Sequence, residues 1–140
     1  MSDWNAKMID EFRARGGKNI PNFGDRLLLL TVKGAKTGTP RTYPLAFTRD
    51  GDKIVVAASK GGAPSNPDWY RNVVANPEVE LEIGAERFKA HATPLAEGAE
   101  RNRLYGQHAD VMPGFHDYEL KTDRIIPVVV LERVATPVAA

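Results

Sequence analysis

Cysteine is absent from this chain, and its absence excludes several kinds of chemistry at once. Without a thiol there is no disulfide, no thiolate metal site and no cysteine nucleophile. The three histidines, His91, His108 and His116, lack the spacing of metal ligands. No serine lies in the strand-to-helix pattern of a nucleophile elbow, so hydrolysis has little support. We therefore expect an enzyme or binding protein with no metal centre.

The chain also lacks long apolar runs and a strong excess of charge. The longest apolar runs, residues 27–30 and 128–131, are far shorter than the roughly 20 residues that span a bilayer. The N-terminus has no apolar core of a signal peptide, so a cytoplasmic protein is expected. With 19 basic and 18 acidic side chains the net charge is +1, and no bulk field favours nucleic acid. Any anion must therefore be bound by a local cluster of cations.

The 140 residues are the length of one domain, and the apolar pattern predicts mainly strands. About six strands are expected, over residues 26–33, 41–49, 53–58, 79–83, 86–93 and 125–134. Pro44 predicts an edge strand or a bulge in the second of them. Helices are expected over residues 67–76, with Asn66 as N-cap, and 97–109, followed by a loop and short helix over 112–122. This order is typical of a small barrel decorated by helices; an open α+β sheet is the alternative.

Residues 1–18 predict an amphipathic helix in which Ser2 is the N-cap and two glycines, residues 16 and 17, end the helix. Trp4, Met8, Ile9 and Phe12 recur at helical spacing. The first interpretation is a helix that covers one end of the barrel. The alternative is an interfacial helix that touches anionic lipid, which would make the protein peripheral on the inner face of the cell membrane.

Two glycine-containing loops carry cations. The segment GAKTGTPR, residues 34–41, places backbone N–H groups, a threonine hydroxyl, Lys36 and Arg41 between two strands, a set that suits phosphate. The segment AASKGG, residues 57–62, has small side chains that leave room for a flat ring, and it adds Lys60. The alternative for both segments is a solvated turn.

Two further segments carry aromatic side chains. NPDWYRN, residues 66–72, opens a helix with Trp69 and Tyr70, which are either core residues or a wall beside the glycine loop. Residues 112–118 supply an aromatic wall and a candidate proton donor, Tyr118. His116 is followed by Asp117, but adjacent residues on a helix point to different faces, so we expect a solvated pair.

Four motifs, in this order and with these separations, resemble the deazaflavin (F420)-dependent nitroreductase family of actinobacteria. They are GAKTGTPR, RDGDKIVVAASKGG, NPDWYRNVVANP and TDRIIPVVVLER. These proteins are also called F420H2-dependent quinone reductases. The resemblance covers roughly residues 20–134 of a single domain, 1–140, behind the helix of residues 1–18. It implies a split β-barrel of the kind shared with flavin-binding oxidases, which holds coenzyme F420.

The resemblance also implies a site. The coenzyme-binding positions would be Ala35, Lys36, Thr37, Arg41, Thr42, Tyr43, Pro44, Leu45, Ala46, Ala57, Ala58, Ser59, Lys60, Asp68, Trp69, Tyr70, Arg71, Asn72 and Phe115. Lys36, Arg41 and Lys60 would hold the phosphate and glutamyl tail. Phe115 and Tyr118 would line the acceptor side, with Tyr118 and Ser59 as the candidate catalytic residues. The chain departs from the family pattern in two ways: Ala35 replaces a second basic residue, and Met112 and Phe115 replace tyrosines.

These implications describe an F420H2-dependent oxidoreductase that passes a hydride to a small acceptor: a quinone, an activated enone or a nitroaromatic. Two rivals stay open. One is an FMN-dependent reductase on the same fold, and the other is a non-catalytic carrier of flavin or deazaflavin. The sequence leaves the physiological acceptor and the oligomeric state open.

Overall fold

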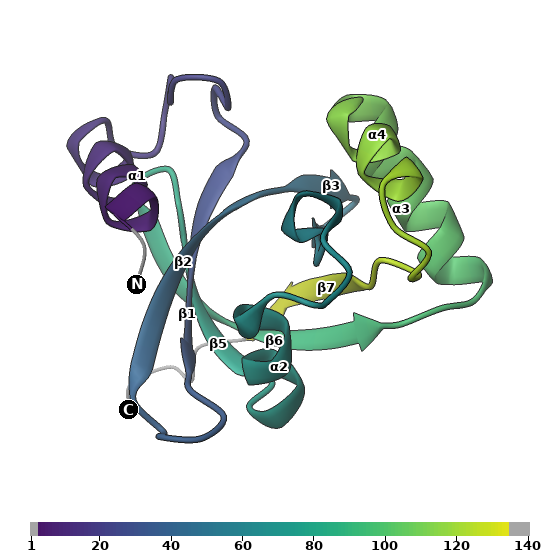
Figure 1. Ribbon diagram of the computed structural model, residues 1–140. Coiled ribbons are helices and arrows are strands. Elements are labelled where there is room, and N and C mark those ends of the chain that lie inside the picture. The colour runs from purple at the N-terminus through teal and green to yellow at the C-terminus, as the bar shows by residue number, and fades with distance from the viewer. Residues whose placement is uncertain (1–2, 135–140) are drawn as a thin grey trace.

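The computed structural model describes residues 3–134 as one curled sheet with helices around it (Figure 1), which confirms the α+β class. Its strands are β1 (Leu27–Lys33), β2 (Pro40–Ala46), β3 (Thr48–Asp50), β4 (Lys53–Ala57), β5 (Glu78–Ile83), β6 (Glu86–Leu95) and β7 (Val128–Arg133). Its helices are α1 (Asp3–Ala14), the 3₁₀ turn η1 (Lys60–Gly62), α2 (Asp68–Ala75), α3 (Ala99–Val111) and α4 (Gly114–Leu120).

The order of the strands explains how the sheet curls. It is β2-β1-β5-β6-β7-β4-β3, and neighbouring strands run antiparallel. The two edge strands, β2 and β3, are successive parts of one chain segment, which Figure 1 shows arching from one edge to the other. The sheet is therefore a half-barrel whose two edges are connected by this segment.

The sheet has seven strands, so the expectation of about six was wrong. One strand was expected over residues 41–49, but the segment changes partner at Phe47. Before Phe47 it pairs with β1, and after it with β4. Phe47 is buried, and its N–H donates to the carbonyl of Arg26 at 2.9 Å, the last step of the pairing with β1.

Strands β1, β4 and β7 each contain an uninterrupted run of four buried apolar residues, because both faces of the sheet are covered there. In β1, Leu28 and Leu30 belong to the barrel core, whereas Leu27 and Leu29 pack outward with residues of α1. In β4 and β7, Val55 and the other outward side chains pack with residues of α3. Side chains thus fill the barrel interior, which leaves its outer surface and rim for a functional site.

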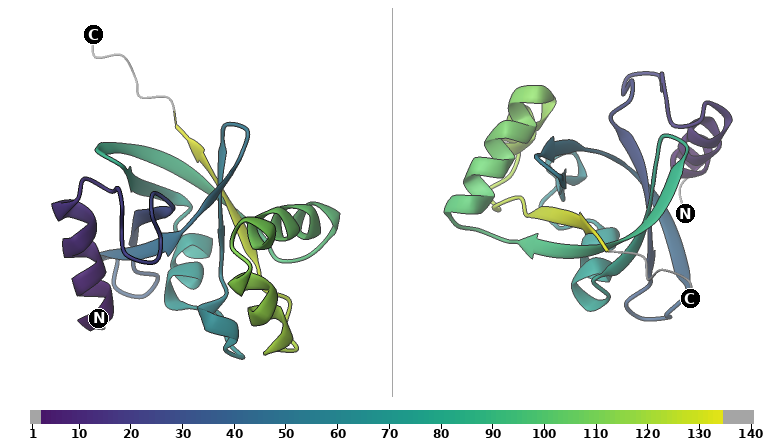
Figure 2. Two further views of the ribbon diagram at one scale, coloured as in Figure 1. Left: turned by 90° about the horizontal axis from the view of Figure 1, so that it is seen from above. Right: turned by 180° about the vertical axis from the view of Figure 1, so that it is seen from behind.

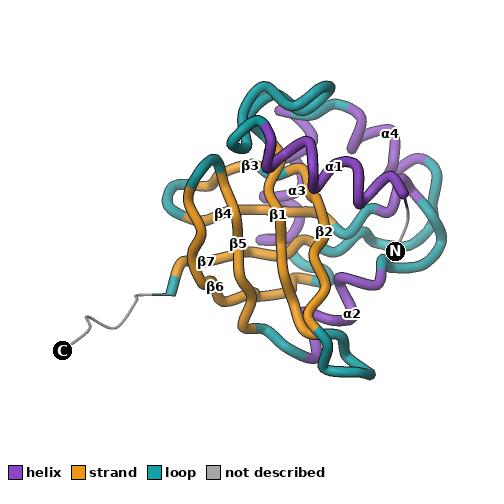
Figure 3. The backbone as a smooth tube through the Cα atoms, turned by 90° about the vertical axis from the view of Figure 1, so that its left-hand side faces the viewer, coloured by secondary structure: helices purple, strands orange, loops and turns teal. Residues whose placement is uncertain are grey.

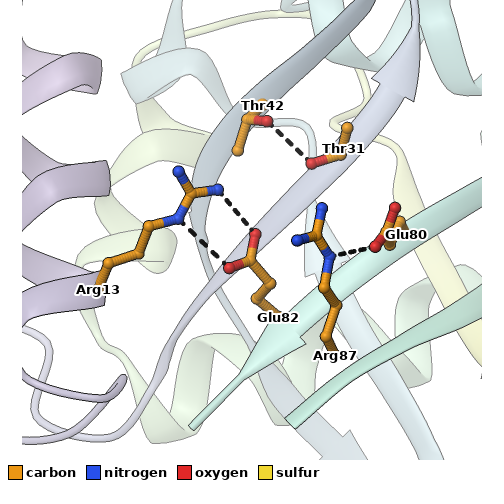
Figure 4. Close-up of polar contacts among 6 residues, drawn as sticks. All are labelled: Arg13, Thr31, Thr42, Glu80, Glu82 and Arg87. Atoms are coloured by element: carbon orange, nitrogen blue, oxygen red, sulfur yellow. Dashed lines mark hydrogen bonds and ion pairs between the residues drawn. The ribbon is translucent and has the colours of Figure 1, made fainter. Parts of the chain in front are cut away.

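Helix α1 lies against the outer face of the sheet. Ile9 and Phe12 are buried in a cluster with Leu27 and Leu29. Arg13 donates to both carboxylate oxygens of Glu82 on β5, with Nη2–Oε2 at 3.0 Å and Nε–Oε1 at 3.4 Å (Figure 4). This hydrogen bond raises the pKa of the Arg13 guanidinium above its ordinary value. Ile9 and Phe12 are therefore covered by the sheet, as the covering interpretation predicts, whereas Trp4 of the same stripe stays exposed.

The same part of the sheet carries two further polar contacts, visible in Figure 4. Thr31 and Thr42 bring their hydroxyls to 2.8 Å across β1 and β2, and Arg87 pairs with Glu80 across β5 and β6. Thr31 and Thr42 occupy directly opposite strand positions, whereas Arg87 lies opposite Glu82 and reaches Glu80 diagonally; contacts of both kinds stabilise the pairing of strands.

Several element bounds differ from those expected. Helix α1 ends at Ala14, earlier than residue 18, because Gly16 and Gly17 take positive φ angles of 61° and 74°. The proposed N-cap Ser2 lies outside the described residues. Helix α2 has Pro67 as its N-cap residue, not Asn66, because the Asn66 side chain accepts from Arg124 instead. The last strand begins at Val128, after Pro127, and α3 begins at Ala99.

The helices frame one side of the half-barrel. Figures 1 and 2 show α1 and α4 on opposite sides of the β2–β3 segment, and Figure 3 shows α1, α2 and α4 displaced to one side of the strands. Within residues 3–134, no helix is long and apolar enough to cross a membrane.

Candidate functional site

A cleft of about 1250 Å³ is lined by α1, β2, the chain from Ala57 to Gly61, the start of α2 and residues 112–118. This volume exceeds the roughly 300–1,000 Å³ of common small-molecule pockets, so a large ligand and a smaller one fit together. Among its strand residues, Leu27 and Ala57 belong to the outward-facing clusters, whereas Tyr43 and Leu45 of β2 pack against the barrel core.

Two cations in the cleft lack an acidic partner. The side chain of Arg41, exposed on the edge strand β2, makes no hydrogen bond or ion pair within residues 3–134. The Nζ atom of Lys60 donates only to the Ser65 hydroxyl at 3.4 Å in the same part of the chain. Of the other charged lining residues, Arg13 pairs with Glu82 and Asp68 with Arg71, whereas Asp10 of α1 forms no ion pair within residues 3–134. The β2 and η1 walls therefore attract an anion.

The chain at η1 presents backbone to the cleft. Lys60, Gly61 and Gly62 follow one another with positive φ angles of 48°, 63° and 85°. Such a conformation costs about 1–3 kcal/mol at a non-glycine residue such as Lys60, and it is typical of functional sites. Gly61 lines the cleft, and a Cβ atom there would meet no protein atom within 4 Å. The missing side chain thus leaves the backbone open to a ligand, as a flat ring requires.

Aromatic side chains of α4 form another wall. The rings of Phe115 and Tyr118 meet edge to face, with centroids 5.2 Å apart and planes at 77°. Phe115 is supported from behind by the ring of His108 at 4.4 Å, and its carbonyl accepts the Tyr105 hydroxyl at 2.6 Å. The hydroxyl of Tyr118 makes no hydrogen bond in the described part of the chain and lines the cleft. It is free to donate to a ligand.

Apolar residues of the N-terminal segment complete the cleft. Trp4 and Ile9 of α1 line it, together with Phe23 of the following loop. The side chain of Trp4 is 53% exposed, so it stands free for contact with a ligand. The sequence predicted an apolar stripe on this helix, as a cover for the barrel or as a membrane contact, but nothing in its spacing shows which side chains reach a distant wall.

Tyr43 offers a second phenol to the cleft. Its hydroxyl accepts from the Asn72 Nδ2 atom at 3.1 Å, and the Asn72 Oδ1 atom accepts the Ala35 N–H at 2.9 Å. Burial raises the pKa of Tyr43 above its ordinary value, so the phenol stays protonated at neutral pH. Asn72 therefore connects the loop after β1 to the cleft through Tyr43.

The cleft brings together most of the predicted coenzyme positions. These are Arg41, Thr42, Tyr43, Pro44, Leu45, Ala46, Ala57, Ser59, Lys60, Asp68, Trp69 and Phe115, joined by the candidate catalytic residue Tyr118. The other candidate catalytic residue, Ser59, is 9% exposed. Trp69 belongs to the barrel core and to the cleft at once, so both interpretations of this side chain hold.

Other predicted positions lie outside the lining of the cleft: Ala35, Lys36, Thr37, Ala58, Tyr70, Arg71 and Asn72. Ala58 and Tyr70 belong to the barrel core. The hydroxyl of Thr37 accepts the Thr39 N–H at 3.2 Å within its own loop. Lys36 is exposed, and the loop that carries it is held toward α2 by the Ala35–Asn72 hydrogen bond. The three predicted cations are therefore not a single set in this structure.

Two histidines have partners that the sequence did not indicate. His116 lies 3.1 Å from the Asp110 carboxylate, so the solvated pair expected with Asp117 is formed with another residue. His108 is fully buried, with Nδ1 at 2.8 Å from the Thr48 hydroxyl. Burial lowers the pKa of His108 to about 4, so the ring is neutral at pH 7 and serves as packing behind Phe115.

Residues 3–133 match the family described as F420H(2)-dependent quinone reductase. The chain belongs to this family. The F420H(2)-dependent quinone reductase of Mycobacterium tuberculosis (strain ATCC 25618 / H37Rv) is 43% identical over 121 residues, which cover 85% of this chain and 80% of that protein. A solved structure described as an F420-H2 dependent reductase (FDR-A) is 39% identical, with a TM-score of 0.70 over 76% of this chain and 94% of that one.

The fold extends beyond the F420H2-dependent quinone reductase family. The heme storage protein HutZ of Vibrio cholerae shares it with a TM-score of 0.62 over 91% of this chain and 89% of that one. Its sequence identity is 18%, so the likeness concerns the fold alone. The shared fold therefore gives no indication of what the cations of the cleft bind.

Proposed function

We propose that this chain is an F420H2-dependent oxidoreductase whose cleft holds the coenzyme against β2 and η1 and an apolar acceptor against α4 and α1. When bound, the reduced deazaflavin supplies a hydride as a two-electron unit. The observation that carries the proposal is one cleft with two cations free of acidic partners, Arg41 and Lys60, and an aromatic wall.

The residues proposed to bind the coenzyme lie on β2, on η1 and at the start of α2. Arg41 and Lys60 would pair with the phosphate and the carboxylates of the glutamyl tail, because charge-assisted hydrogen bonds to such oxygens are strong and both cations are available. The backbone from Ala57 to Gly61 would lie against the ring system, since no side chain at Gly61 blocks it. Trp69, which is 5% exposed, provides a rigid surface at the start of α2.

Acceptor binding falls to the aromatic and apolar side chains of the cleft. Phe115 and Tyr118 form one wall, and Trp4 contributes from α1. Apolar walls exclude water from a bound quinone ring, which protects a hydride donor from side reactions. The free hydroxyl of Tyr118 is suited to donate a hydrogen bond to a carbonyl or nitro oxygen as negative charge develops on it.

The test is a titration of purified protein with F420 and with FMN, each followed by ligand fluorescence. Arg41 and Lys60 favour the polyanionic tail, so F420 is expected to bind and FMN to bind more weakly. The complex with reduced F420 is then mixed with a simple naphthoquinone, and reoxidation of the coenzyme is followed by absorbance. Tighter binding of FMN than of F420 would contradict the proposal, and binding without reoxidation would indicate a carrier.

Substitution of Trp4 by alanine is expected to raise the KM for a lipophilic quinone by about tenfold, the scale of losing one buried aromatic contact. Coenzyme affinity and melting temperature should stay unchanged, because the side chain is 53% exposed in the free protein. Steady-state kinetics with saturating reduced F420 measure the effect. Deletion of the whole helix is a poorer test, since it would expose Leu27 and Leu29.

The matched control is Val74→Ala. Val74 is apolar and 56% exposed, and it lies on α2 outside the cleft lining. Its removal should leave the KM for the quinone at the wild-type value. If Trp4→Ala behaves like Val74→Ala, the N-terminal helix takes no part in binding the acceptor.

A further inference from the structure

Arg124, in the segment between α4 and β7, holds an unusual set of hydrogen-bond partners. Its guanidinium donates from Nε to the Ala63 carbonyl at 2.8 Å and from Nη1 to the Asn66 Oδ1 atom at 2.8 Å. Its Nη2 atom donates to the carbonyls of Ala58 at 3.1 Å and Ser59 at 2.8 Å. Every partner is an uncharged oxygen, and no carboxylate lies within ion-pair distance of Arg124 among residues 3–134.

These four acceptors span one loop, from the end of β4 to the start of α2. The same loop contributes Ser59, Lys60 and Gly61 to the cleft. Its backbone is irregular, with three successive positive φ angles at residues 60–62. A conformation of this kind persists only when its surroundings fix it. The Ser59 carbonyl, for example, accepts from Arg124 and also from the Gly62 N–H at 3.0 Å.

The loop is also pressed against the helix that carries the acceptor wall. A Cβ atom on Gly62 would lie 2.8 Å from the Cβ of Lys121 and 3.0 Å from the carbonyl oxygen of Tyr118. Glycine is therefore required there, and a displacement of the loop is transmitted to α4. Phe115 and Tyr118 of α4 line the cleft. The position of one loop thus sets the backbone facing the coenzyme and the wall facing the acceptor.

We infer that Arg124 is a positioning residue, which fixes the loop of residues 58–66 in the conformation that receives the coenzyme and supports α4. The inference rests on the proposed function but concerns a residue that does not line the cleft. Arginine is suited to the task because its planar group offers five N–H donors in fixed directions. Burial lowers the pKa of Arg124, in keeping with a cation held by carbonyls and away from acids.

The test compares wild type with Arg124→Lys, which keeps the charge but has one nitrogen for four acceptors. Affinity for F420, measured by fluorescence titration, should fall by about tenfold or more. In the free protein, trypsin should cut after Lys60 faster than in wild type. Cleavage after Lys36 serves as an internal reference, because that exposed loop has no contact with Arg124. A general loss of stability would speed both cuts alike.

Arg133→Lys is the control variant. Arg133 also uses two nitrogens, at 2.7 Å from each carboxylate oxygen of Glu86, but it lies outside the cleft. Its substitution should change neither F420 affinity nor cleavage after Lys60. A second variant, Arg124→Ala, leaves a space lined by carbonyls, and low millimolar guanidinium should restore part of its F420 affinity.

The outcomes separate this inference from the proposed function. Wild-type affinity and wild-type cleavage after Lys60 in Arg124→Lys overturn the inference. Faster cleavage with unchanged affinity overturns its coenzyme part, because the loop would then move without effect on binding. If wild type itself does not bind F420, the proposed function fails, and the cleavage rate alone decides whether Arg124 holds the loop.

Discussion

The Arg41→Ala variant is expected to bind F420 about 10- to 100-fold more weakly than wild type, a loss of about 1.5–3 kcal/mol. The reason is the state of Arg41 in the free protein. It lines the cleft on an edge strand, and its side chain has no hydrogen bond or ion pair within residues 3–134. Its charge is therefore available to an anion, and no internal partner competes for it. Fluorescence titration with F420 measures the change.

The fold should tolerate this substitution. Arg41 is exposed, and its strand remains paired with β1 from Leu27 to Lys33. The melting temperature is therefore expected to stay close to that of wild type. Salt provides a second signature, because an exposed ion pair with the coenzyme is screened as ionic strength rises. Wild-type affinity should fall with added salt more steeply than the affinity of Arg41→Ala.

Lys36→Ala is the matched control. It removes the same charge from the same stretch of chain, but Lys36 lies outside the cleft lining. Its effect on F420 affinity should be small. Two results would contradict the proposed phosphate site: Arg41→Ala with wild-type affinity, or Lys36→Ala with an equal loss. The second result would indicate that the glutamyl tail extends along the loop of residues 34–39.

The strands were predictable from the sequence because the pattern of apolar residues along a strand shows which of its faces are buried. The uninterrupted apolar runs of β1, β4 and β7 follow from two buried faces, and the alternating run in β5 from one. The change of partner at Phe47 was not predictable, because it depends on where β1 ends and β4 begins in space. No pattern in the residues around Phe47 indicates this change of partner.

The candidate site was likewise predictable only in part from the sequence. Residues 41–46 and 57–60 were predicted as coenzyme positions, and all of them except Ala58 line the cleft. The apolar stripe of α1 was predicted, but not which of its side chains line the cleft, since that depends on how α1 lies against a distant part of the sheet. Arg124 was missed for the same reason: its four acceptors lie in another segment, and no spacing pattern connects them.

Replacement of Tyr118 by phenylalanine is expected to lower turnover on a quinone or enone by about 10- to 100-fold. The ring is retained in this variant, so the edge-to-face contact with Phe115 at 5.2 Å should persist. Only the hydroxyl is lost, and it makes no hydrogen bond within residues 3–134. Stability and F420 affinity should therefore match those of wild type. The loss should appear in turnover measured with saturating acceptor.

Tyr43→Phe is the informative comparison, because Tyr43 is the other phenol of the cleft. Its hydroxyl already accepts from Asn72 at 3.1 Å, and the residue lies on β2, the strand proposed to hold the coenzyme. Its loss is expected to change F420 affinity more than turnover. If Tyr118 is the donor, the two variants separate: one loses rate and the other loses affinity. If Tyr118→Phe keeps wild-type turnover while Tyr43→Phe loses it, the donor is on β2. If neither variant loses rate, the proton comes from solvent, and the aromatic wall of α4 serves binding alone.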